Sequence, residues 1–535
     1  MALIQVVDLS FTYPGALHPL FEHVNLDLDT NWRLGLVGRN GRGKTTFLKL
    51  LLGRLGYTGS IASPVAFEYF PFDPGDTTAP ALAVAKRSIA PFDAWEAEMA
   101  ELIAQGTEEA IEHYGDIEAQ YAAADGYTID EQITAEAGRL GIHPSVLERP
   151  FETLSGGERL KLLLAALFLK KHRFLLIDEP TDHLDAEGRR TVARWLASKS
   201  GFILVSHDRA FLDEAVDHIL SINRADIELQ KGNYSSWRHN RALQDAHEMD
   251  ENKRLTAQIS QLKAAAERTE KWSDKIEKSK SGNGKATYNH GPASVDRGYI
   301  GHQAARMMQR SKAIERRRGR QVEEKQSLLK NIETADPLVF HLLKPDKARL
   351  VTAEKLALAF GQRTLFQDLS FEINAGDRIA VAGPNGSGKS SLLGLVLGRL
   401  TPTGGHIQRL SSLVTSTLPQ ETDGLAGDLR AFAADFGVDA SLFMTLLRKL
   451  NFEREAFERP IESYSAGQKK KVCLAASLAK PAHLFVWDEP LNYIDVHSRE
   501  QIEAAVLASQ PTLLFVEHDR IFVENIATKT IEVGL

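Results

Sequence analysis

Two glycine-rich segments have the composition and spacing of phosphate-binding loops. Gly38–Thr45 reads GRNGRGKT and Gly383–Ser390 reads GPNGSGKS, and each lies between an apolar stretch and a Leu-rich one. This order predicts a strand, a loop and a helix, whose N-terminal backbone N–H groups bind phosphate. The lysine of each loop is expected to reach the β- and γ-phosphates, and the final hydroxyl to bind Mg²⁺. The predicted nucleotide-binding residues here are Gly38, Asn40, Gly41, Gly43, Lys44, Thr45 and Thr46, and Gly383, Asn385, Gly386, Gly388, Lys389, Ser390 and Ser391.

Two acidic pairs, Asp178-Glu179 and Asp488-Glu489, end apolar stretches that read as buried strands. Each aspartate is expected to hold Mg²⁺, and each glutamate to orient or deprotonate the attacking water. An isolated Asp-Glu-Pro is a common turn. Here, however, Ser155 and Ser465 each precede the aspartate by 23 residues, since 178 − 155 and 488 − 465 are equal. The constant spacing favours a catalytic role.

Two histidines, His207 and His518, also end apolar stretches, and they follow the same serines by 52 and 53 residues. A single histidine is more often structural. The matched pair favours contact with a γ-phosphate.

Because these motifs recur in one order, the chain is predicted to contain two α/β domains. The first is expected over residues 1–234, with about 35 extra residues forming a helical insertion near 84–133, and the second over 346–535. Residues 235–345 separate them.

The separating segment is predicted to be a helical hairpin. It has no Pro or Gly from Tyr234 to Trp272, a second helical stretch over 304–334, and a glycine-rich tip near 280–303. Arms of about 30 residues would be ~45 Å long. Residues 271–320 hold 13 Lys and Arg against 4 Asp and Glu, in a 535-residue chain whose net charge is −7. This suggests a polyanionic partner, and the alternative is a solvated coiled coil.

The composition excludes several protein classes. The content of 43% hydrophobic and 25% charged residues is that of globular proteins, and no run approaches the ~20 apolar residues that span a bilayer. The single cysteine, Cys473, is expected to be a buried apolar residue. The N-terminus reads as a strand and not as a signal peptide, so a cytoplasmic protein is expected.

Together these motifs resemble the ATP-binding cassette. The resemblance implies a head-to-tail sandwich in which ATP lies between the lysine loop of one cassette and the signature segment of the other. It adds the predicted ATP contacts Ser155, Gly156, Gly157 and Glu158 in one signature, Ser465, Ala466, Gly467 and Gln468 in the other, and the adenine platforms Tyr13 and Phe360. The Mg²⁺ ligands it implies are Thr45, Asp178, Ser390, Gln420 and Asp488.

Two cassettes joined by a basic hairpin are similar to the ABC-F family, and the segments 487–495 and 296–302 are similar to its Lsa-type antibiotic-resistance branch. The resemblance implies a monomer that binds the ribosome near the tRNA exit site, contacts ribosomal RNA and tRNA, and relieves inhibition by lincosamides, pleuromutilins and streptogramin A. Two positions depart from the pattern. Phe72 stands where the first cassette should carry a sensing glutamine, and Ala466 stands where glycine is usual.

Three alternatives remain open at this point. A transporter ATPase subunit has no need of the basic hairpin. A DNA-associated repair ATPase would use the same positive charge. A housekeeping ABC-F translation factor would share every motif but give no drug protection.

Overall fold

The computed structural model describes residues 2–281 and 337–534, apart from Leu17, Asp182, His183, 224–226 and Gln362. The chain forms two compact units. One contains Met1–Trp237 together with Ala335–Leu535, and the other is Arg238–Thr334. The first unit holds both repeats of the sequence, called here the first repeat (residues 2–237) and the second repeat (337–534).

The first repeat contains two sheets. A six-stranded sheet has the order β5-β6-β7-β3-β8-β9 and is parallel except for β9, and a three-stranded antiparallel sheet has the order β2-β1-β4. The strands are β1 (Leu3–Phe11), β2 (Phe21–Asp29), β3 (Arg33–Val37), β4 (Thr58–Ala62), β5 (Ala66–Phe70), β6 (Arg173–Asp178), β7 (Phe202–Val205), β8 (His218–Ile222) and β9 (Ile227–Lys231). Since parallel strands point their carboxyl ends to one edge, the sheet collects its functional loops there.

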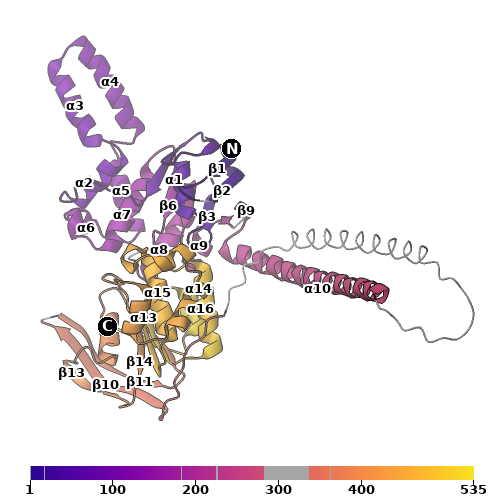
Figure 1. Ribbon diagram of the computed structural model, residues 1–535. Coiled ribbons are helices and arrows are strands. Elements are labelled where there is room, and N and C mark those ends of the chain that lie inside the picture. Colours follow the sequence, from indigo (N-terminus) through magenta and orange to yellow (C-terminus); the bar gives the residue numbers. More distant parts are fainter. Residues whose placement is uncertain are drawn as a thin grey trace, which may run out of the picture. The chain divides into compact units, whose positions relative to one another are not determined.

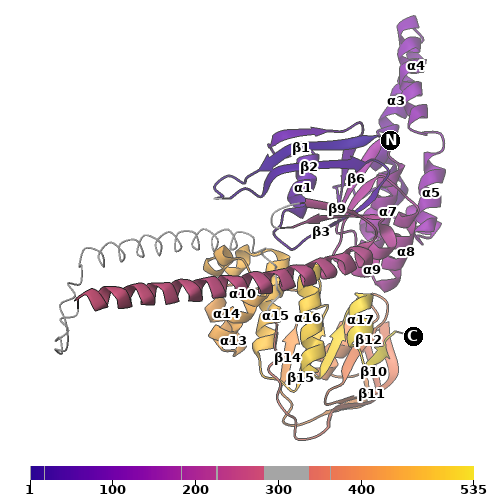
Figure 2. The ribbon, with the colours of Figure 1, turned by 90° about the vertical axis from the view of Figure 1, so that its right-hand side faces the viewer.

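The helices of the first repeat include the predicted insertion. They are α1 (Lys44–Leu51), α2 (Ala81–Ile89), α3 (Phe92–Gln105), α4 (Glu108–Ala123), α5 (Ile129–Arg139), α6 (Pro144–Leu147), α7 (Gly156–Leu169), α8 (Ala186–Ala197) and α9 (Arg209–Ala215). Figures 1 and 2 show α3 and α4 side by side, projecting from the rest of this repeat. The helical prediction for 84–133 therefore agrees with the structure.

The second repeat has the same plan. Its parallel sheet has the order β14-β15-β16-β12-β17, and its antiparallel sheet has the order β11-β10-β13. The strands are β10 (Arg349–Phe360), β11 (Arg363–Asn374), β12 (Arg378–Ala382), β13 (Gly404–Arg409), β14 (Thr415–Leu418), β15 (Leu484–Asp488), β16 (Leu513–Val516) and β17 (Lys529–Glu532). The helices are α12 (Lys389–Val396), α13 (Leu429–Phe436), α14 (Ala440–Lys449), α15 (Ala466–Ala479), α16 (Val496–Ser509) and α17 (Arg520–Ile526). The predicted tandem α/β architecture is thus confirmed.

Strand register places the two repeats in correspondence. Phe70 pairs with Ile177, which directly precedes Asp178, and Leu418 pairs with Trp487, which directly precedes Asp488. Two residues beyond Phe70 and Leu418 stand Phe72 and Gln420, so the predicted equivalence of these last two residues holds in the structure.

Helix α10 (Tyr234–Ser281) forms the first arm of the predicted hairpin. It has 48 residues, about 72 Å at 1.5 Å per residue, so the expected arm of about 30 residues was too short. The physical reason is in the sequence, because the run without Gly or Pro continues to Ser281 and no helix breaker interrupts it. Residues 282–336, which hold most of the predicted tip and the second arm, lie outside the described residues. Among the helices that the structure describes, none is long and apolar enough to span a bilayer.

Candidate functional site

The two phosphate-loop lysines begin helices α1 and α12, as the loop sequences predict. Gly43 and Gly388 cap these helices with φ of 91° and 99°, a conformation that L side chains rarely adopt. A Cβ on Gly43 would also lie 2.8 Å from Leu20 Cδ2. The glycine is therefore required both by its dihedral angle and by space.

Each lysine folds back onto carbonyl oxygens of its own loop. Lys44 Nζ donates to Gly38 O at 2.7 Å, and Lys389 Nζ donates to Gly383 O and Pro384 O, each at 2.9 Å. Burial lowers the pKa of both lysines. Each buried ammonium is hydrogen-bonded to neutral carbonyl oxygens, and phosphate oxygens would be stronger, charged acceptors.

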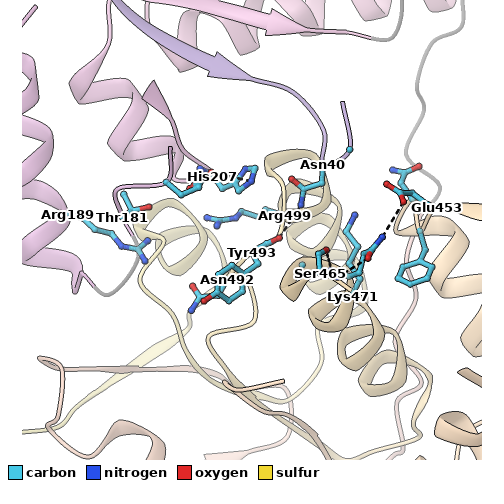
Figure 3. Close-up of a pocket in the computed structure, with 16 residues that line it drawn as sticks. Asn40, Thr181, Arg189, His207, Glu453, Ser465, Lys471, Asn492, Tyr493 and Arg499 are labelled. Atoms are coloured by element: carbon cyan, nitrogen blue, oxygen red, sulfur yellow. Dashed lines mark hydrogen bonds and ion pairs between the residues drawn. The ribbon is translucent and has the colours of Figure 1, made fainter. Parts of the chain in front are cut away.

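A cavity of about 290 Å³, called site 1, combines residues of both repeats. Figure 3 shows Asn40 and His207 from the first repeat near Ser465 and Tyr493 from the second. The lining residues that were predicted from sequence are Asn40, Gly41, Glu179, His207, Ser465, Gly467 and Gln468. The loops are in contact, since Asn40 Nδ2 donates to Tyr493 O at 3.2 Å.

The reciprocal cavity, site 2, is larger, at about 970 Å³. It brings together the predicted residues Asn385, Gly386, Gly388, Lys389, Ser390, Ser391, Gln420, Glu489 and His518 with Ser155, Gly156, Gly157 and Glu158 of the first repeat. Each cavity therefore joins the phosphate loop of one repeat to the signature segment of the other.

The signature segments are placed by capping. Ser155 and Ser465 are the N-caps of α7 and α15, and each forms a capping box with the residue three positions later, Glu158 or Gln468. A Cβ on Gly467 would lie 2.7 Å from Tyr493 O, so this position has no room for a side chain. Ala466, which stands where glycine is usual, lines site 2 and not site 1.

The carboxylate of Glu489 is held by three side chains. Gln420 Nε2 donates to Oε1 at 2.8 Å, His518 Nε2 lies 3.7 Å from Oε1, and Asn492 Nδ2 donates to Oε2. Burial alone would raise the pKa of Glu489, but these hydrogen bonds and the His518 charge outweigh it and lower the pKa to about 2. The group is therefore an ionised proton acceptor.

Glu179 in the first repeat has a similar but less complete setting. His207 Nε2 lies 3.4 Å from Glu179 Oε1, and burial together with the nearby Lys44 charge holds the pKa of His207 well below its usual value. Both glutamates have left-handed backbones, with φ of 49° at Glu179 and 46° at Glu489. Strain of this kind is characteristic of functional positions.

The two aspartates differ. Asp178 Oδ2 accepts hydrogen bonds from Thr45 Oγ1 at 2.9 Å and from Tyr69 Oη at 3.0 Å. Asp488 is buried beside Ser390, burial raises its pKa, and within the described residues its Oδ1 has no hydrogen-bond partner. A buried carboxylate oxygen without a partner, next to a hydroxyl group, fits a hard cation such as Mg²⁺.

Phe72 packs against apolar residues and makes no polar contact with Glu179. Its ring is partly buried against the hydrophobic core of the first repeat, edge-on to Phe70 and beneath the ammonium of Lys170. Gln420, its counterpart, faces Glu489. The first repeat therefore lacks the polar side chain that the second repeat offers to its glutamate.

The two predicted adenine platforms line neither cavity, but both are accessible. Tyr13 is exposed and its hydroxyl lies 2.7 Å from Thr46 Oγ1 at the start of α1, and Phe360 is exposed at the end of β10. Cys473 is buried, and burial raises the pKa of its thiol to about 11, as expected for an inert residue.

Two aspartates contribute more than the sequence suggested. Asp495 lies close enough to Lys44 and His207 of the other repeat to act on their charge, and it accepts a hydrogen bond from Lys471 Nζ at 3.1 Å. Asp185 of the first repeat likewise lies close enough to Lys389 of the second to act on its charge. Each follows the aspartate predicted to bind Mg²⁺ in its own repeat by seven residues, and that constant spacing is the signal that could have found the pair.

The fold and the paired phosphate loops define a P-loop ATPase with two cavities, each lined by both repeats. The family model described as "ABC transporter" matches residues 21–182 and 366–492, which together exceed half of the chain. The chain therefore belongs to the ATP-binding cassette family, and the two matched segments confirm the predicted pair of cassettes. It is an ATP hydrolase.

Curated relatives match nearly the whole chain. The "Ribosome protection protein VmlR" of Bacillus subtilis (strain 168) is 29% identical over 515 residues, covering 95% of this chain and 82% of the relative. The "Tylosin resistance ATP-binding protein TlrC" of Streptomyces fradiae is 28% identical over 525 residues, covering 94% and 92%.

A solved structure shares the fold. It is the complex of the archaeal ribosomal stalk protein aP1 and the archaeal ribosome recycling factor aABCE1, with a TM-score of 0.58 and 18% identity over 98% of this chain and 87% of that one.

Proposed function

We propose that this ATPase binds ATP at both composite sites, closes its two repeats around the nucleotides, and reopens after hydrolysis. The observation that carries the proposal is the composition of the two cavities, since each is lined by the phosphate loop of one repeat and the signature segment of the other. A ligand that touches both walls favours their approach by its differential affinity for the closed state.

The residues have distinct roles in this cycle. Lys44 and Lys389 exchange loop carbonyls for phosphate oxygens, which relieves the charge deficit of a buried ammonium. Mg²⁺, when bound, neutralises phosphate charge, and the hydroxyl and carboxylate groups of Thr45, Asp178, Ser390 and Asp488 fit it. Glu489 accepts the proton of the attacking water at a carboxylate oxygen, while His518 holds that carboxylate in place.

We further propose that the partner is the ribosome, bound in the cytoplasm by a monomer. Support comes from the excess of nine positive charges in residues 271–320 and from the similarity to the ribosome protection protein VmlR. A segment that grips the phosphate backbone without reading bases requires positive charge of this density. The DNA-associated alternative uses the same charge, so an experiment must separate the two.

The decisive experiment is sedimentation of the double variant Glu179→Gln with Glu489→Gln. The variant keeps the phosphate contacts but lacks the proton acceptors, so it should accumulate in the closed state and pellet with ribosomes in ATP. Wild-type protein in ADP is the matched control. Pelleting with nucleoid DNA in place of ribosomes would establish the alternative, and hydrolysis at the wild-type rate would remove both glutamates from the mechanism.

The finer proposal is drug protection. Residues 235–345 would extend towards the peptidyl transferase centre and relieve inhibition by lincosamides, pleuromutilins and streptogramin A. Translation in a drug-inhibited extract tests this, with residues 286–302 replaced by a Gly/Ser linker as the comparison. Rescue by the intact chain and loss of rescue with the linker support protection. A chain that binds ribosomes but never rescues is a translation factor without drug protection.

A further inference from the structure

A buried lysine in the second repeat connects the two nucleotide sites. Lys470 lies in the second turn of α15, and only 1% of its surface is exposed. Its Nζ donates to Pro419 O at 2.8 Å, to Gln420 O at 3.2 Å and to Asp488 O at 3.2 Å. An ammonium has three N–H donors, so all of them are used.

The choice of acceptors is unusual. In the part of the chain that the structure describes, Lys470 Nζ forms no ion pair within 4.0 Å, and all three acceptors are backbone carbonyls. Burial lowers the pKa of this lysine. The carboxylates of Glu517, Asp488 and Glu489 act on this charge from a distance, but the direct contacts of the ammonium are the three carbonyl oxygens.

The segments that Lys470 joins serve different sites. Its own helix starts at the signature residues Ser465 and Gly467, which line site 1. The three carbonyls belong to Asp488 at the end of β15 and to the segment Pro419-Gln420. Gln420 and Glu489, the residue after Asp488, both line site 2. A displacement of that segment on nucleotide binding at site 2 is therefore passed to a helix whose other end contacts site 1.

The first repeat lacks this connection. The residue five positions after its signature serine is Leu160, a partly buried apolar side chain packed against the core, and Phe72 replaces Gln420. Leucine has no donor, so α7 has no such tie to its own strand end and sensing segment. At this helix position, only the second repeat has a lysine that donates hydrogen bonds to these backbone carbonyls.

We propose that Lys470 is a positioning residue that couples ATP binding at the two sites, and that this coupling is carried by the second repeat. The inference rests on the proposed sandwich of two composite ATP sites and adds to it the residue through which the two sites communicate. Because binding coupling is reciprocal, emptying site 2 must weaken ATP binding at site 1 through this lysine.

The test measures site 1 with site 2 intact or disabled. Photolabelling with 8-azido-ATP, followed by peptide mapping, separates label on the first repeat from label on the second. Lys389→Met disables site 2. In the otherwise unchanged chain, this substitution should raise the half-saturating nucleotide concentration for the first repeat by about five-fold or more, the lower end of ordinary allosteric coupling.

The variant is Lys470→Met, which keeps the length of the side chain and removes the donors. The matched control is Leu160→Met at the equivalent position of α7. In the Lys470→Met background, Lys389→Met should change the half-saturating concentration by less than about two-fold. In the Leu160→Met background the coupling should be retained. Lys470→Gln, which keeps two donors, replaces Lys470→Met if the latter does not give a folded protein.

Three outcomes would contradict the proposal or its basis. Full coupling in folded Lys470→Met or Lys470→Gln protein overturns the proposal, as does an equal loss of coupling in Leu160→Met. Absence of labelling on both repeats in the unchanged chain contradicts the ATP sandwich itself and not the role of Lys470.

Discussion

The arginine that follows the His-Asp pair is present in both repeats, but in only one of them does it contact the other repeat. Arg209 follows His207-Asp208 in the first repeat, and Arg520 follows His518-Asp519 in the second. Arg209 Nη2 donates to Glu503 Oε2 of the other repeat at 2.8 Å and lies 3.7 Å from Asp519 Oδ1, with 8% of its side chain exposed. Arg520 is 58% exposed and pairs with Glu524 in its own helix.

Substituting Arg209→Met should therefore destabilise the association of the repeats. Removing one partner of a buried ion pair costs about 3–5 kcal/mol. The lower end applies, because Asp519 keeps hydrogen bonds from Arg499 and from Phe522 N, and Glu503 keeps one from Asn525. A loss of about 3 kcal/mol corresponds to a fall of roughly 6–12 °C in melting temperature for units of 150–250 residues.

The matched control is Arg520→Met. An exposed i,i+4 pair is screened by water and contributes little, so its melting temperature should fall by less than about 2 °C. Calorimetry of the three proteins measures both shifts. Adding Glu503→Gln to Arg209→Met should recover part of the loss, because it removes a charge left without its partner. Equal shifts for the two arginines, or no recovery, would refute the reasoning.

Three further predictions follow from the sites. Glu489→Gln should reduce ATP turnover more than Glu179→Gln, since Phe72 leaves the first repeat without the amide that holds Glu489, and equal losses in single-variant ATPase assays would contradict this. The pKa of Glu489 is lowered to about 2, so its ionisation adds stability to the folded protein. This stability, at most roughly 3 kcal/mol, is complete above about pH 4.5 and is lost as the pH falls towards 2. It should be missing from the acid unfolding curve of Glu489→Gln. Tyr69→Phe should lower about ten-fold the Mg²⁺ concentration needed for nucleotide photolabelling of the first repeat. The reason is that the Tyr69 hydroxyl no longer hydrogen-bonds to the Asp178 carboxylate in competition with the metal. An unchanged Mg²⁺ dependence would exclude that competition.

Much of the fold could be predicted from the sequence because its evidence is local. A strand, a loop with glycines at fixed places and a helix beginning at lysine are specified within about fifteen residues, as at Gly38–Thr45 and again at Gly383–Ser390. The insertion was found by comparing two intervals. The length of α10 was underestimated because the charged residues beyond Trp272 carry no apolar period, although nothing there breaks a helix.

The contacts between segments distant in sequence could not be predicted. Nothing near Tyr69 indicates that its hydroxyl reaches Asp178, 109 residues later. Likewise, Arg209 and Arg520 occupy identical motifs, and they differ because the residue available for an ion pair in the other repeat differs. Glu503 stands eight residues after the N-cap of α16, whereas the equivalent residue after the N-cap of α8 is the buried Ala193.

Three of the differences between the repeats share one direction. Polar residues of the second repeat, Glu503, Lys470 and Gln420, correspond to the apolar Ala193, Leu160 and Phe72 of the first. An apolar side chain packs in place without requiring a particular partner, whereas a buried charge or amide is stable only while its partners are present. The second repeat therefore has the side chains whose energies change when a phosphate or a neighbouring segment moves. If the two repeats close around ATP as proposed, we expect the second repeat to respond more strongly to nucleotide than the first.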